Sequence, residues 1–118
     1  MALEHLLPGQ AHALLPRGPL PADFESRALF KSRDLEVIQL LMPEGRRMPD
    51  HRVDGEITLQ CVKGCIDVGS REHGDAHPRP TTRLVEGELM YLRRGEPHHL
   101  LAVVASVVLL TIALHATE

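Results

Sequence analysis

The chain has 118 residues, close to the usual size of one domain, and its 43% hydrophobic and 25% charged residues are ordinary for a globular protein. A net charge of −3 and an aromatic content of only 3% give no basis for binding nucleic acid. The most apolar run, residues 100–114, is shorter than the ~20 residues of a membrane-spanning helix. Two cysteines and no export signal predict a cytoplasmic protein.

Residues 1–27 contain prolines at positions that exclude a helix and weaken a central strand: Pro8, Pro16, Pro19 and Pro21. The same segment carries several leucines, which favour packing over solvation. We therefore predict an extended N-terminal arm over residues 1–27, lying on the domain or on a partner subunit. The domain itself is expected to span residues 28–118.

Short apolar and β-branched segments separated by glycine and proline follow the arm, and no helical period is visible. This pattern predicts an all-β barrel or sandwich. Residues 69–82, which include His73 and His77, are polar and contain two prolines, so a long exposed loop is expected there. About eight strands are predicted, at residues 28–30, 35–42, 57–62, 65–68, twice within 83–92, at 99–104 and at 107–114.

Lys63-Gly64 predicts a two-residue hairpin turn between the strands at 57–62 and 65–68. Alternation along these strands then gives one almost wholly apolar face, expected to point into the core: Ile57, Leu59, Cys61, Ile66 and Val68. Cys61 and Cys65 fall on opposite faces, so no disulfide is expected between them. The same parity, carried backwards, points Val53 and His51 inward. An inward histidine is either bonded to a backbone carbonyl or part of a site.

Two segments resemble the two conserved motifs of the cupin superfamily. Residues 45–64 match the spacing of the first motif, G-x5-H-x-H-x3-E-x6-G, at Gly45, His51 and Gly64. Residues 87–102 are similar to the second motif, G-x5-P-x-G-x2-H-x3-N, and match it at three positions: Gly87, Gly95 and His98. Two motifs in order and without gaps imply a single cupin-type jelly roll or conical β-barrel.

Metal-binding cupins use two histidines and a glutamate of the first motif and the histidine of the second. The resemblance carries over to His51 and His98, whereas Val53 and Ile57 occupy the other two ligand positions. A further ligand would be needed to hold iron, manganese, zinc or nickel. The candidates are His99, expected on the opposite face, the loop residues His73 and His77, and Glu56 if the strand bulges.

Without a metal, the same residues form an apolar pocket lined by His51, Val53, Ile57 and His98. Burial would keep both imidazoles neutral near pH 7, able to orient a carboxylate, hydroxyl or enol or to act as a base. The leading hypothesis is a cupin-like protein that binds a small molecule without the full metal centre. The alternatives are a metal-dependent enzyme of dioxygenase or isomerase type, and a structural role. The family precedent and the arm also predict a homodimer.

Overall fold

The structure is a computed structural model that describes residues 5–72 and 77–114. Within these ranges there is no helix that could cross a membrane. The described chain forms nine strands: β1 (Glu25–Lys31), β2 (Leu35–Met42), β3 (Arg47–His51), β4 (Ile57–Lys63), β5 (Cys65–Ser70), β6 (Thr82–Val85), β7 (Leu89–Leu92), β8 (His98–Ala102) and β9 (Ser106–Ala113).

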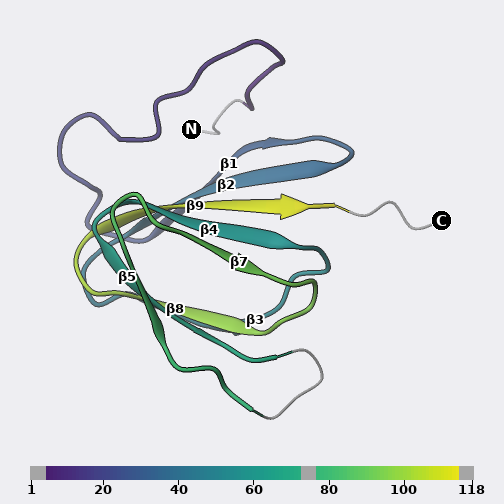
Figure 1. Ribbon diagram of the computed structural model, residues 1–118. Coiled ribbons are helices and arrows are strands. Elements are labelled where there is room, and N and C mark those ends of the chain that lie inside the picture. Colours follow the sequence, from purple (N-terminus) through teal and green to yellow (C-terminus); the bar gives the residue numbers. More distant parts are fainter. Residues whose placement is uncertain (1–4, 73–76, 115–118) are drawn as a thin grey trace.

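The strands form two antiparallel sheets that face each other (Figure 1). One sheet has five strands in the order β1-β2-β9-β4-β7, and the other has four in the order β3-β8-β5-β6. Every pairing joins strands that run in opposite directions. This confirms the predicted all-β class and the jelly-roll type of barrel.

The core lies between the sheets and is built from side chains at alternate positions. Ile57, Leu59 and Cys61 of β4 and Ile66 and Val68 of β5 are all at most 3% exposed. They belong to one cluster with inward residues of the other strands. The predicted inner face is therefore correct. Cys65, which alternation turns outward, is half-buried, and both cysteines are free thiols.

The hairpin predicted at Lys63-Gly64 is wrong. β4 pairs with β7 and β9, whereas β5 pairs with β6 and β8, so the chain leaves one sheet and enters the other at this turn. The green-blue corner in Figure 1 shows this passage. A tight glycine turn between two apolar strands looks the same in sequence whether the strands pair or separate. Inward residues stay inward in both cases because the two sheets share one core.

Three further differences from the prediction affect the N-terminal segment and the region around His51. β3 was not predicted as a strand, and it carries His51 at its end. β1 begins at Glu25, so the expected boundary after residue 27 falls inside a strand. β5 continues to Ser70, and Arg71 forms an isolated bridge with Pro78, so the exposed loop is shorter than residues 69–82.

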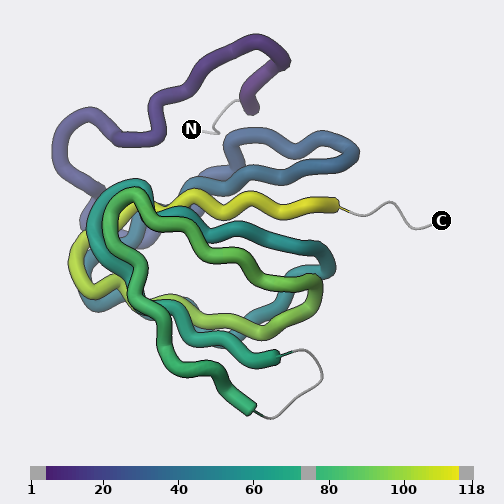
Figure 2. The backbone as a smooth tube through the Cα atoms, in the orientation of Figure 1, coloured from purple at the N-terminus to yellow at the C-terminus, as the bar shows by residue number. Residues whose placement is uncertain are grey.

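Residues 5–24 form no strand and lie against their own chain (Figure 2). The amide of Leu6 donates to the carbonyl of Leu29 at 2.8 Å, and Nε2 of Gln39 donates to the carbonyl of Leu14 at 2.6 Å. Leu41 and Val107 pair across β2 and β9 and are fully buried, although their chain neighbours point into the core. We infer that the N-terminal segment covers this outer part of the five-stranded sheet. Contact with a partner subunit stays a prediction.

Candidate functional site

His51 and His98 are brought together by the pairing of β3 with β8. The two residues face each other in the register, and their ring centroids are 4.2 Å apart with an interplanar angle of 59°. β3 is an edge strand with an irregular register between Met48 and His51, so Pro49 can lie there without removing a hydrogen bond from the sheet interior. The sequence prediction that both histidines belong to one place is supported by this geometry.

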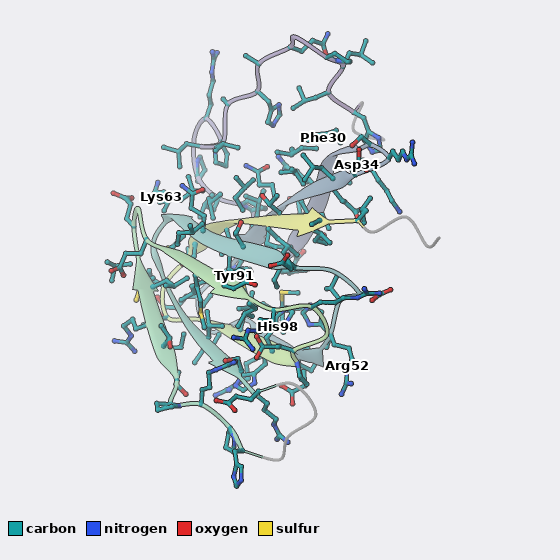
Figure 3. All side chains as sticks on the ribbon, turned by 45° about the vertical axis from the view of Figure 1, so that its right-hand side comes forward. Phe30, Asp34, Arg52, Lys63, Tyr91 and His98 are labelled. Atoms are coloured by element: carbon teal, nitrogen blue, oxygen red, sulfur yellow. The ribbon has the colours of Figure 1, made fainter. Side chains whose placement is uncertain are left out.

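His98 lies inside the barrel, between the two sheets (Figure 3), and is 1% exposed. Its Nδ1 lies 3.2 Å from the carbonyl oxygen of Glu96. Because a carbonyl oxygen only accepts, Nδ1 carries the proton and Nε2 presents a lone pair. No described residue bonds to this buried Nε2. Burial also lowers the pKa of His98, so the ring is neutral near pH 7.

His51 has the same hydrogen-bond arrangement. Its Nδ1 lies 3.2 Å from the carbonyl oxygen of Pro49, two residues earlier, so its proton is also on Nδ1. Among the described residues, Nε2 of His51 has no hydrogen-bond partner. The pair therefore offers two acceptor nitrogens, which suit a ligand with a hydroxyl or N–H group.

A buried carboxylate fixes the turn that precedes His98. Glu96 is 3% exposed; its Oε1 accepts the amide of Arg93 at 2.7 Å, and its other oxygen is ion-paired with Arg79. Arg79 also donates to the hydroxyl of Ser70 at 3.2 Å, and Ser70 is the other cross-strand neighbour of His98. Sequence reasoning missed this network. The available signal was a carboxylate inside a glycine-containing turn, two residues before the motif histidine.

Val53 and Ile57 lie in the core, but on different walls. Val53 is half-buried and packs against the core cluster after β3 ends. Ile57 belongs to the opposite sheet, where it pairs with Leu92 and Ile112. Both positions are therefore apolar packing sites, and neither supplies a polar group to the histidine pair.

The proposed third metal ligands do not converge on this pair. Glu56 is exposed and accepts a hydrogen bond from the hydroxyl of Tyr91, and Nδ1 of His99 pairs with the carboxylate of Asp50 at 2.8 Å on the outer face. His77 lies in the exposed loop, and His73 is outside the described residues. Within residues 5–72 and 77–114, no three histidine, cysteine or acidic side chains are arranged to hold a metal. The described residues do not fit the cupin metal centre.

A cleft of about 170 Å³ opens beside His51. It lies where β3 and β5 end and β8 begins, away from the Lys63 corner (Figure 3). The amide of Arg71 donates to the carbonyl of Pro97 at 3.1 Å and holds two of its walls together. The lining residues are Asp50, His51, Arg52, Arg71 and Pro97. No sequence signal pointed to the two arginines.

Solved structures match almost the whole chain. A conserved protein of unknown function from Streptococcus pyogenes has a TM-score of 0.74 at 19% identity, over 99% of this chain and 97% of that one. A cupin superfamily protein from Desulfitobacterium hafniense has a TM-score of 0.72 at 13% identity, over 98% and 100% of the two chains. This chain has the cupin fold. A cupin with a double-stranded β-helix from Methanocaldococcus jannaschii agrees, with a TM-score of 0.69 at 14% identity over 91% and 94%.

No protein-family model and no curated protein matches the sequence. The structural similarity establishes the cupin fold. At identities of 13% to 19% it establishes nothing about activity. The motif glycines explain why the resemblance was visible: all four have positive φ, between +75° and +94°, and so mark turns that the fold needs. These are Gly45, Gly64, Gly87 and Gly95.

Proposed function

We propose that this cupin-fold protein binds a small molecule at the barrel end that holds His51 and His98. The observation that carries the proposal is the unpartnered Nε2 of His98, which is buried with its lone pair free. An unsatisfied buried polar atom is costly and rare in native proteins, so a ligand hydroxyl or N–H group would stabilise it.

The histidine pair can also act on such a ligand. A neutral imidazole held by a backbone carbonyl at Nδ1 accepts a proton at Nε2, as a general base does. The lowered pKa of His98 makes it a weak base, suited to orienting a hydroxyl or taking a proton from an already acidic enol. Binding is therefore the main proposal, and catalysis depends on the ligand found.

A ligand screen tests this function. Protein prepared without a histidine tag is screened by thermal shift and by NMR against a panel of small hydroxylated and N–H-bearing metabolites. We expect at least one to bind, and binding to be lost in the His51→Ala/His98→Ala variant but kept in His12→Ala, which changes an exposed histidine of the N-terminal segment. Binding that is unchanged in the double variant, or no binding at all, would refute the proposal.

Metal analysis of the same preparation tests the competing function. Two imidazole Nε2 atoms are also what a divalent metal would take, although the described residues add no third ligand. Stoichiometric iron, manganese, zinc or nickel that disappears in the double variant would replace ligand binding by the metal-dependent alternative.

We further propose that the protein is a homodimer. Large apolar side chains remain exposed on the outer surface of the described chain, among them Leu35, Leu89 and Tyr91. Leu89 and Tyr91 alternate with inward residues of β7, at the edge of the five-stranded sheet. Light scattering at micromolar concentration tests this proposal, and a monomer under these conditions would refute it.

A further inference from the structure

The cleft beside His51 joins cationic and hydrogen-bond-accepting groups in one small space. Arg52 follows the end of β3, and Arg71 follows the end of β5, so the sheet places residues that are far apart in sequence on one rim. The imidazole of His51, with its proton held on Nδ1 by the carbonyl of Pro49, forms another part of the wall. The cleft therefore presents both cationic side chains and an imidazole with an acceptor nitrogen.

The arginines are available for an anion. Both are exposed, and neither forms an ion pair with a described carboxylate, unlike Arg79, Arg83 and Arg94. Guanidinium groups match the planar geometry of a carboxylate and bind it with two parallel N–H···O bonds. Two such groups at one cleft indicate that the ligand carries a negative charge.

The carboxylate of Asp50 limits the negative charge that a ligand in the cleft can carry. The cleft also contains Asp50, whose carboxylate is paired with His99 on the outer face. A second negative charge on the ligand would meet this carboxylate, which favours a monoanionic carboxylate over a phosphate dianion. The volume of about 170 Å³ is well below that of a pocket for a drug-sized molecule, so the ligand is small.

We infer that the ligand is a small hydroxycarboxylic acid, whose carboxylate is bound by Arg52 and Arg71 and whose hydroxyl donates to Nε2 of His51, the member of the histidine pair that lines the cleft. This inference rests on the proposed function and names its ligand class. It explains why the unpaired arginines and the histidine with a free acceptor nitrogen line the same cleft.

Titrations of the full chain with four kinds of probe test the inference. The first is a set of small monoanionic hydroxy acids: lactate, glycerate and glycolate. The others are propionate, which lacks the hydroxyl, lactamide, which lacks the charge, and inorganic phosphate. We expect a hydroxy acid to bind, propionate to bind about fivefold more weakly, and lactamide about tenfold more weakly, following the usual strengths of neutral and charged hydrogen bonds.

Two variants and a matched control separate this inference from the proposed function. Arg52→Gln and Arg71→Gln should each weaken hydroxy-acid binding about tenfold and leave the urea midpoint unchanged. Arg33→Gln makes the same charge change at an exposed turn beside β2 and should have no effect. Equal binding of lactamide, unchanged binding in both variants, tighter binding of phosphate, or no binding of any hydroxy acid would overturn the inference. A neutral ligand that still needs His98 would leave the proposed function standing.

Discussion

His98 combines deep burial with a hydrogen bond that uses only one of its ring nitrogens. Cross-strand pairing adds His51 on one side and Ser70 on the other, so the ring has a fixed place and orientation. This arrangement makes the imidazole a rigid acceptor inside the barrel. It also means that protonation of His98 would destabilise the folded state, because the charge would lie where there is little water.

Stability should fall as the pH drops below neutrality. The lowered pKa of His98 means that the unfolded chain, where histidine titrates near ~6.5, binds a proton before the folded chain does. The stability that His98 contributes is fully present above about pH 6.5, the pKa of histidine in the unfolded chain. It is lost as the pH falls from there towards the lower pKa of the folded chain. Urea unfolding measured at several pH values from about 7 to 5 checks this.

Substituting His98 tests whether its imidazole causes the pH dependence of stability. His98→Asn keeps a donor near the carbonyl of Glu96 but cannot titrate, so its stability should change less with pH over the same range. His12→Asn, at an exposed site, should behave as the natural chain does. Equal slopes for His98→Asn and the natural chain would show that another group causes the pH dependence.

Removing Arg79 should destabilise the barrel end. In Arg79→Met the carboxylate of Glu96, buried beneath it, loses its ion-pair partner, and we expect a loss of about 1–3 kcal/mol because a buried charge is left unpaired. Denaturant unfolding measures the change. In Arg83→Met the partner Asp67 is reachable by water, so little change is expected. Glu96→Gln, which keeps an acceptor for the amide of Arg93, should restore part of the stability to Arg79→Met.

At the scale of elements, the sequence predicted the strands that alternate apolar residues and the inner face of the barrel. It missed β3, because Arg47–His51 contains a proline and few apolar residues, and its extended form depends on pairing with β8. The hairpin predicted at Lys63-Gly64 was wrong because the pairing of β4 and β5 depends on contacts with strands far along the chain. For the same reason the sequence indicated the two histidines but not the arginines of the cleft, which meet only after both sheets are assembled.

The Lys63-Gly64 corner depends on glycine for two separable reasons. Gly64 has φ of +94°, and an added Cβ would lie 2.3 Å from Oγ of Ser106 and 2.7 Å from the carbonyl oxygen of Ala105. The hydroxyl of Ser106 cannot move freely, because it accepts the amide of Cys65 at 3.0 Å. Gly87 has a similar φ of +90° with open space around it.

Comparing alanine at these two positions measures the close contact alone. Gly87→Ala should cost about 1–2 kcal/mol, for its backbone conformation. Gly64→Ala should cost clearly more, because the clash is added to a similar backbone strain. Chemical denaturation of both variants gives the difference. A Gly64→Ala variant no less stable than Gly87→Ala would mean that the corner relaxes without loss.

At the scale of the molecule, the N-terminal segment completes the outer surface of the barrel. Deleting residues 1–22 should expose Leu41 and Val107, each worth about 1.5–3 kcal/mol when fully buried. We expect the shortened chain to unfold at lower denaturant and to self-associate through the uncovered surface, as light scattering would show. If the shortened chain has the same stability and the same oligomeric state as the full chain, the N-terminal segment does not cover Leu41 and Val107.

Because Cys61 and Cys65 point in opposite directions, the reactivities of their thiols can report how often the barrel opens. Cys65 is half-buried, whereas Cys61 is sealed in the core, and burial raises the pKa of its thiol. A thiol reagent should therefore modify Cys65 in the native protein and reach Cys61 only when the two sheets part. Mass spectrometry can count the two events in the same chain, so the rate at which the second label appears reports how often the core is exposed to solvent.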